Sequence, residues 1–131
     1  MQKKKEQVKL NRCGIDIVEI DRITAIREKH DFEHRIFSER ELAVAAEHGC
    51  KPEFFAGRWA AKEAVAKTLG CGFGKDCSPC EVEVLQDESG APQLALSGAA
   101  ARRADRLGIR SWCVSVSHEK HYAVAMAVAE C

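Results

Sequence analysis

The chain has 131 residues, of which 46% are hydrophobic and 31% charged, and its 20 basic and 20 acidic residues give a formal net charge of zero. This length and composition are typical of one soluble globular domain and exclude two separate cores. A neutral chain has no bulk attraction to nucleic acid or to an anionic membrane, so neither partner is expected. No long apolar run follows the basic amino terminus, so neither a membrane span nor a signal peptide is predicted.

The first half of the chain predicts one strand and three helices. Residues 1–10 are expected to be a flexible extension, and the apolar stretch CGIDIV predicts a strand that ends at Val18. Isoleucines at three-residue spacing then predict a helix over 19–30. The pattern SERE, from Ser38, is a capping box that begins a second helix. Proline near its start and glycine at its end predict the longest helix, over 53–69.

The second half predicts four strands and one further helix. Alternating residues predict strands over 80–86 and 93–96, a serine-capped helix follows, and two strands near the carboxyl end form a hairpin around SHEKH. The order β-α-α-α-β-β-α-β-β predicts an α+β fold with a mainly antiparallel sheet packed against a long central helix. We expect residues 11–131 to form this single domain.

The longest predicted helix lacks a polar face. On a helical wheel its aromatic and large aliphatic side chains form one arc, and Arg58 and Lys62 fall inside that arc. Gly57 and the alanines form a small-residue face suited to close packing. Glu63 and Lys67 lie together at the edge of the aromatic arc, either as a surface i, i+4 pair or as groups that face a ligand. Buried charges need partners, so an ion or an anion is expected beside this helix.

Three further features bear on a site. Asp16 lies between two isoleucines in the first strand, where it either caps the following helix or points inward toward a cation. Carboxylates at 16 and 63 together suit a hard divalent ion such as Mg²⁺. Ser117 and His118, near the end of a strand, are candidate donors to an anion. The loop LGCGFGK follows a helix, so it is not a Walker or Rossmann phosphate loop, but its glycines allow close backbone approach to a ligand.

Taken in order, the motifs resemble the holo-[acyl-carrier-protein] synthase family, the short-type 4′-phosphopantetheinyl transferases. The resemblance covers residues 11–130 and rests on five stretches of this sequence: GIDIVEIDRI, RIFSERE, FFAGRWAAKEAVAK, the G-F-G loop and SVSH. It implies the 4′-phosphopantetheinyl transferase fold, and it implies transfer of phosphopantetheine from coenzyme A to a serine of apo acyl carrier protein in fatty acid biosynthesis, leaving 3′,5′-ADP. A homotrimer with sites between subunits is also implied. KDCSPC and the cysteine at 71 depart from the family pattern.

The resemblance also implies roles for single residues. Asp16 and Glu63 match the metal-binding pair for Mg²⁺, and Glu63 and Lys67 are the expected catalytic residues. A metal-bound water or Glu63 would accept the serine proton. The residues that match coenzyme A contacts are Arg58, Lys62, Lys67, Gly72, Gly74, Ser117 and His118. The residues that match carrier-protein contacts are Arg22 and Ile26. Arg27 and Lys29 add basic charge to the same helix.

The cysteines support rival interpretations. Seven cysteines without a secretion signal favour reduced thiols and a cytoplasmic location. Cys71, Cys77 and Cys80, with Cys50 as a fourth ligand, have a spacing that a structural zinc site also uses. The C-x-x-C within this set lacks the βαβ context of a redox motif. A non-catalytic module that binds carrier proteins is a further alternative, and the longer, two-unit transferases are disfavoured by the length.

Overall fold

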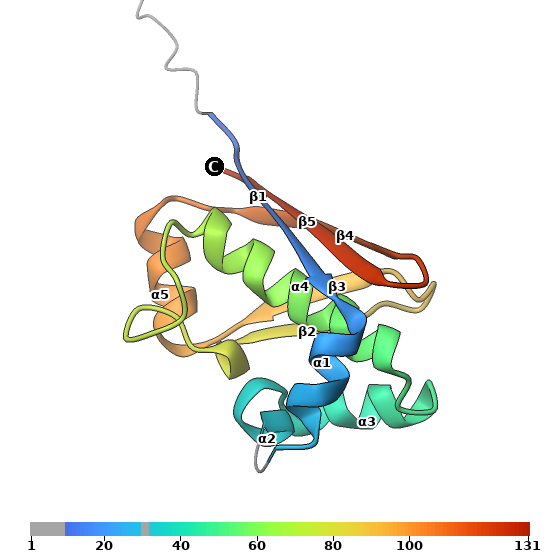
Figure 1. The fold of residues 1–131 in the computed structure, drawn as a ribbon. Coiled ribbons are helices and arrows are strands. Elements are labelled where there is room, and N and C mark those ends of the chain that lie inside the picture. Colours follow the sequence, from blue (N-terminus) through green and yellow to red (C-terminus); the bar gives the residue numbers. More distant parts are fainter. Residues whose placement is uncertain (1–9, 30–31) are drawn as a thin grey trace, which may run out of the picture.

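Helix α4 (Pro52–Thr68) runs through the middle of the molecule and has strands on two sides (Figure 1). The computed structural model describes residues 10–29 and 32–131, so the predicted extension lies almost wholly outside the described residues. The other elements, in chain order, are β1 (Arg12–Glu19), α1 (Ile20–Arg27), α2 (Phe32–Ile36), α3 (Glu39–Glu47), the 3₁₀ turn η1 (Pro79–Glu81), β2 (Val82–Gln86), β3 (Pro92–Leu96), α5 (Gly98–Arg106), β4 (Ser111–His118) and β5 (Tyr122–Glu130).

The strands form two antiparallel sheets. One has the order β1-β5-β4 and the other pairs β2 with β3. The α+β fold around a long central helix is therefore confirmed, although the sheet is divided in two. The short helix α2 was not predicted. The predicted Ser38 capping box is present: Ser38 Oγ accepts a hydrogen bond from the Glu41 amide, and the Glu41 carboxylate accepts one from the Ser38 amide.

Small residues set the contact between α4 and the larger sheet. The alanines of β5 face inward and are buried, whereas Tyr122 and Met126 are exposed on the other face. Gly14 makes this contact possible, because a Cβ there would lie 2.3 Å from the Ala64 carbonyl oxygen. The small-residue face of α4 predicted from the sequence is thus buried within the chain, and it is not available for contacts between subunits.

Two arginines hold the carboxyl end of α4. Arg12 Nε donates to the Thr68 carbonyl at 2.8 Å, and Arg103 Nε donates to the Leu69 carbonyl at 2.7 Å. Carbonyls in the last turn of a helix lack partners within it, and cations there also interact favourably with the helix dipole. β1 and α5 are thereby fixed to the same end of α4. Among the described residues, no helix is both long and apolar enough to cross a membrane.

Candidate active site

Asp16 and Glu63 line one pocket of about 470 Å³ between β1, α1 and α4. Asp16 lies on the inward face of β1 with Gly14 and Val18, as the alternation predicted. The side chain does not cap α1, because Glu19 occupies that N-cap position. Arg22, Ile26, Trp59 and Tyr122 also line this hollow, which we call the Asp16 pocket.

Lys67 is hydrogen-bonded to Asp16 of this pocket. Its Nζ donates to Asp16 Oδ1 at 2.9 Å and to the Ile15 carbonyl at 3.0 Å. The lysine side chain is 54% exposed and the aspartate side chain 15% exposed. In the described chain no ion pair joins Lys67 to Glu63, so the predicted alternative of a surface i, i+4 pair is wrong. Lys67 instead connects α4 to β1 across the site.

The environment of Glu63 suits a cation. Burial raises the pKa of its carboxyl group, and the negative charge of Asp16 raises it further, while Lys67 partly opposes both effects. A divalent cation between the two carboxylates would offset this unfavourable proximity. No group of three or more His, Cys, Asp or Glu side chains is placed to hold a metal within residues 10–29 and 32–131. Two carboxylates with open positions for water and phosphate are nonetheless what Mg²⁺ commonly uses.

Arg58 and His118 line a second hollow, of about 750 Å³, which we call the Arg58 pocket. Arg58 is only 8% exposed, and its guanidinium carbon lies 4.7 Å from the centre of the Phe54 ring. Its Nε is buried without a hydrogen-bond partner, and burial lowers the pKa of the group. A buried cation without its hydrogen-bond partners is costly unless an anion lies near it. The charge of Arg58 at this pocket therefore favours an anion.

The two pockets share no lining residue. Arg58 and Glu63 are five positions apart on α4, and at about 100° per residue their side chains point about 140° apart around the axis. The carboxylates and the Arg58 guanidinium therefore lie at two separate pockets.

Lys62 does not reach either pocket, which corrects its expected role as a coenzyme A contact. Its Nζ donates to Glu41 Oε1 at 2.6 Å, the Pro79 carbonyl at 2.9 Å and the Val82 carbonyl at 2.6 Å. The side chain is completely buried. All three ammonium hydrogens have acceptors, so none is free for a phosphate.

Other predicted contacts lie at separate places. Ser117 is on the outer face of β4, opposite Val124 of β5, and does not line the Arg58 pocket with its neighbour His118. Gly72 and Gly74 are exposed and flank Phe73, whose ring stacks on Trp59 at 5.6 Å. A Cβ at either glycine would meet nothing within 4 Å, so packing within the chain does not require glycine there.

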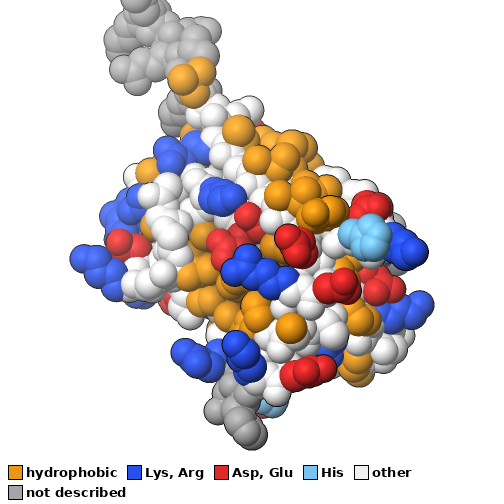
Figure 2. Space-filling view, viewed as in Figure 1, with side chains coloured by type: hydrophobic (Ala, Val, Ile, Leu, Met, Phe, Trp, Pro, Cys, Tyr) orange, Lys and Arg blue, Asp and Glu red, His pale blue; other side chains and the backbone are white. Residues whose placement is uncertain are grey.

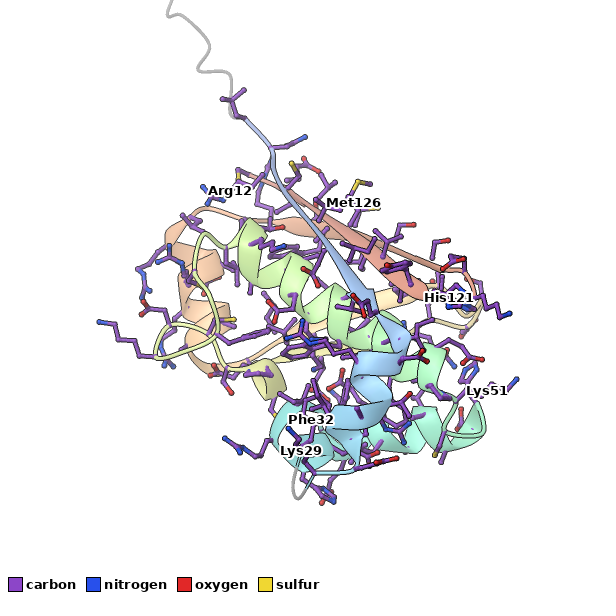
Figure 3. All side chains as sticks on the ribbon, in the orientation of Figure 1. Arg12, Lys29, Phe32, Lys51, His121 and Met126 are labelled. Atoms are coloured by element: carbon purple, nitrogen blue, oxygen red, sulfur yellow. The ribbon has the colours of Figure 1, made fainter. Side chains whose placement is uncertain are left out.

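Helix α1 presents the residues expected to meet a partner. Arg22 is exposed, and it lines the Asp16 pocket together with the half-buried Ile26. Arg27 is engaged within the chain, because it pairs with Glu33 at 2.8 Å and lies 3.7 Å above the Phe55 ring. Lys29 is exposed beyond the end of α1 and is labelled in Figure 3.

The cysteines do not form the zinc site considered from sequence. All seven are free, and no group of metal-ligating side chains gathers in the part of the chain that the structure describes. Cys77 is buried in the core, and burial beside Cys71 raises the pKa of its thiol to about 12. Cys80 Sγ lies 3.3 Å from the Arg35 carbonyl oxygen. The zinc interpretation is therefore wrong for these residues.

Comparison with known proteins agrees with this geometry. The family model of the 4′-phosphopantetheinyl transferase superfamily matches residues 12–127. The chain belongs to this superfamily. Holo-[acyl-carrier-protein] synthase of Hydrogenovibrio crunogenus is 42% identical over 119 residues, covering 89% of this chain and 94% of that protein. The corresponding protein of Hamiltonella defensa is 43% identical, with the same coverage.

Solved transferase structures share the fold. The Helicobacter pylori holo-[acyl-carrier-protein] synthase in complex with coenzyme A is 33% identical with a TM-score of 0.79, covering 90% of this chain and 99% of that one. The Bacillus anthracis synthase in complex with CoA (3′,5′-ADP) is 38% identical with a TM-score of 0.74, covering 90% and 94%. These likenesses confirm the resemblance seen in the sequence motifs.

Sequence reasoning missed two contacts of α4, one in the core beside the site and one in the Arg58 pocket. Glu41, the buried partner of Lys62, was interpreted only as part of a capping box, although a lysine inside an apolar arc signals a missing acidic partner. His48 and Phe54 stack at 4.7 Å and both line the Arg58 pocket. Nothing in their spacing indicates that they meet, since His48 follows α3 and Phe54 lies in α4.

Proposed function

We propose that this chain transfers the 4′-phosphopantetheine group of coenzyme A to a serine of apo acyl carrier protein, in a Mg²⁺-dependent reaction that leaves 3′,5′-ADP. Within a chain of this superfamily, the placement of Asp16 and Glu63 at one pocket, with Lys67 hydrogen-bonded to Asp16, is the observation that carries the proposal. Synthesis of fatty acids in the cytoplasm is the corresponding setting, and the seven free thiols are compatible with it.

The reaction forms one bond and breaks one. The serine oxygen of the carrier attacks the phosphorus that bears pantetheine, and the bond to the departing 3′,5′-ADP oxygen breaks. Asp16 and Glu63 would hold Mg²⁺, which when bound supplies positive charge beside the phosphate oxygens. Lys67, whose side chain is about half exposed and whose Nζ contacts Asp16, is positioned to neutralise the same oxygens. Glu63, at the same pocket, is one candidate acceptor for the serine proton, and a water held beside the two carboxylates is the other.

The Arg58 pocket is the proposed site for the nucleotide end of coenzyme A. Its buried Nε donor has no partner within the chain, and His118 lines the same hollow. A phosphate there would compensate the buried positive charge of Arg58. The stacked His48 and Phe54 rings form an apolar wall beside it.

We propose that a homotrimer brings the Asp16 pocket and the Arg58 pocket of neighbouring subunits together. The pockets of one chain face apart, so a complete site is best assembled from the Asp16 pocket of one subunit and the Arg58 pocket of the next. The outer face of β1 and β5 is a candidate contact surface, because Ile15 and Ile17 are 61% and 63% exposed. Figure 2 shows hydrophobic side chains gathered along these strands, and Met126 projects from the same outer face in Figure 3. Exposed apolar patches of this kind commonly mark interfaces.

The carrier protein is proposed to dock on α1. Arg22 is exposed at the rim of the Asp16 pocket and Ile26 offers apolar contact beside it. An acidic helix of the carrier would meet this basic residue while its serine enters the pocket.

Incubation with coenzyme A, Mg²⁺ and apo acyl carrier protein, followed by intact mass measurement of the carrier, tests the proposal. We expect the carrier to gain one phosphopantetheine and 3′,5′-ADP to appear in equal amount. No mass gain, with binding of the carrier retained, would instead favour a non-catalytic carrier-binding module.

A further inference from the structure

Lys62 and Glu41 form a buried ion pair in which hydrogen bonds satisfy both the ammonium group and the carboxylate. The lysine side chain is 0% exposed and the glutamate side chain 2%. Besides the ammonium group, Glu41 accepts from the Ser38 amide at 3.0 Å and from the Val84 amide at 3.0 Å. Desolvation lowers the pKa of Lys62, and the negative charge of Glu41 opposes that effect. Such a pair requires this complete set of partners to persist in a core.

The pair joins four elements at one point. Glu41 comes from α3 and Lys62 from α4, while the acceptor carbonyls belong to Pro79 of η1 and Val82 of β2. At about 100° per residue, Lys62 points about 160° away from Ala64, which packs against Gly14 of β1. Lys62 therefore holds the side of α4 that faces away from the larger sheet.

This bond set is directional and fully buried, whereas the hydrogen bonds from Arg12 and Lys67 that join α4 to β1 lie at the end of the helix and at the exposed site. Glycine and alanine contacts fix how closely α4 approaches the larger sheet, but they do not specify rotation of the helix about its axis. Several side chains of α4 are fully buried. Among those that the structure describes, Lys62 alone forms side-chain hydrogen bonds with other elements. Glu63 is the next residue, so any rotation of α4 moves its carboxylate relative to Asp16 on β1.

We propose that Glu41 and Lys62 are positioning residues that set the direction of the Glu63 carboxylate toward Asp16. The proposal rests on the proposed function, in which these two carboxylates hold the metal. It replaces the expected contact of Lys62 with coenzyme A. Partners that orient metal ligands typically change metal affinity or activity by about 10–100-fold when they are lost.

The test compares Glu41→Gln, Lys62→Met and the double variant with the wild type. Mn²⁺ binding, measured by electron paramagnetic resonance in the presence of coenzyme A, is read beside turnover and thermal stability. We expect each single variant to bind Mn²⁺ about 10–100-fold more weakly and to lose kcat, with the KM for coenzyme A changed less than about twofold. Arg40→Ala is the matched control, because it breaks a 2.8 Å surface pair with Glu83, between the same helix and the same strand.

The double variant separates positioning from stability. Removing both charges should restore much of the stability that either single change loses. We expect its Mn²⁺ affinity and kcat to stay low. Recovery of metal affinity together with stability would overturn the positioning role, as would a large rise in the KM for coenzyme A in Lys62→Met alone. Wild-type protein that binds Mn²⁺ but transfers nothing would defeat the proposed function and leave the positioning test readable. Wild-type protein that binds no Mn²⁺ would overturn both.

Discussion

Helix α4 carries two ion pairs of the same chemistry in opposite surroundings. Lys62 and Glu41 are buried, and every ammonium hydrogen has an acceptor. Lys67 and Asp16 stand at a pocket, with the lysine more than half exposed. The first pair has no capacity for a ligand, whereas the second keeps open positions on both partners. Completeness of hydrogen bonding, rather than charge, separates the structural pair from the pair that we propose to be functional.

The same criterion applies to Arg58. It is nearly as buried as Lys62, yet its Nε has no partner. A buried charge without its full set of bonds is unfavourable unless something outside the chain supplies them. On α4, therefore, we propose that the unsatisfied cation is a binding position, whereas the satisfied cation belongs to the scaffold.

The largest expected effect follows from changing the two proposed metal ligands, Asp16 of the exposed pair and Glu63 beside it. Asp16→Asn and Glu63→Gln each remove a carboxylate charge while keeping side-chain size, so we expect kcat/KM for transfer to fall at least about 10³-fold. Steady-state transfer at several Mg²⁺ concentrations measures this loss, with circular dichroism confirming the fold. Near-normal turnover in either variant would remove that residue from the metal site.

Replacing Lys62 should lower the stability of the fold much more than replacing Lys67. Lys62→Met leaves Glu41 buried without its partner, so the free energy of unfolding should fall by about 3–5 kcal/mol. Lys67→Met breaks a pair whose lysine is exposed, so the fall should stay below about 1 kcal/mol. Urea titration of both variants measures the difference. Equal losses would contradict the contrast between the two pairs.

A smaller effect is expected on carrier recognition. Arg22→Glu reverses an exposed charge at the rim of the Asp16 pocket, so the KM for carrier protein should rise about tenfold. The KM for coenzyme A should hardly change. Arg106→Glu, on α5, is the control for net charge alone. A similar rise in both KM values for Arg22→Glu would argue against docking on α1.

The smallest effect concerns the dependence of stability on pH. The folded-state pKa of Glu63 is raised above its ordinary value of 4.5. The ionised carboxylate therefore weakens the fold above the raised pKa, and this cost disappears as the pH falls through 4.5. In metal-free buffer at neutral pH, Glu63→Gln should melt about 1–3 °C above the wild type, and the difference should vanish near pH 4.

Glu83→Gln provides a control of opposite sign for that experiment. Its hydrogen bond from Arg40 holds the pKa of the Glu83 carboxyl below the ordinary value. The stability it contributes is present above the unfolded-state pKa and is lost as the pH falls through the folded-state pKa. The variant should therefore be less stable than the wild type at neutral pH. The same sign of change in both variants would contradict the assigned surroundings of Glu63.

Local patterns were sufficient to predict much of this molecule. Alternation placed Asp16 on the inward face of β1, and the absence of a polar face on α4 correctly indicated charges inside the fold. The fate of Lys62 was not predictable in this way, because its acceptors lie 17 to 21 positions away along the chain. The meeting of His48 with Phe54 likewise depends on how α3 turns into α4, and the five-residue helix α2 is too short to leave a periodic signal.

Gly14, in the first motif of this chain, is required because β1 packs closely against α4. An alanine at that position would collide with the Ala64 carbonyl and the Thr68 backbone, which belong to the rigid helix rather than to a flexible side chain. The strand would have to move outward, and Asp16, two residues further along, would move with it. The position of the Asp16 carboxylate relative to Glu63 thus depends on the absence of a Cβ at residue 14. A Gly14→Ala substitution would shift that carboxylate, although the added methyl group would not touch the pocket.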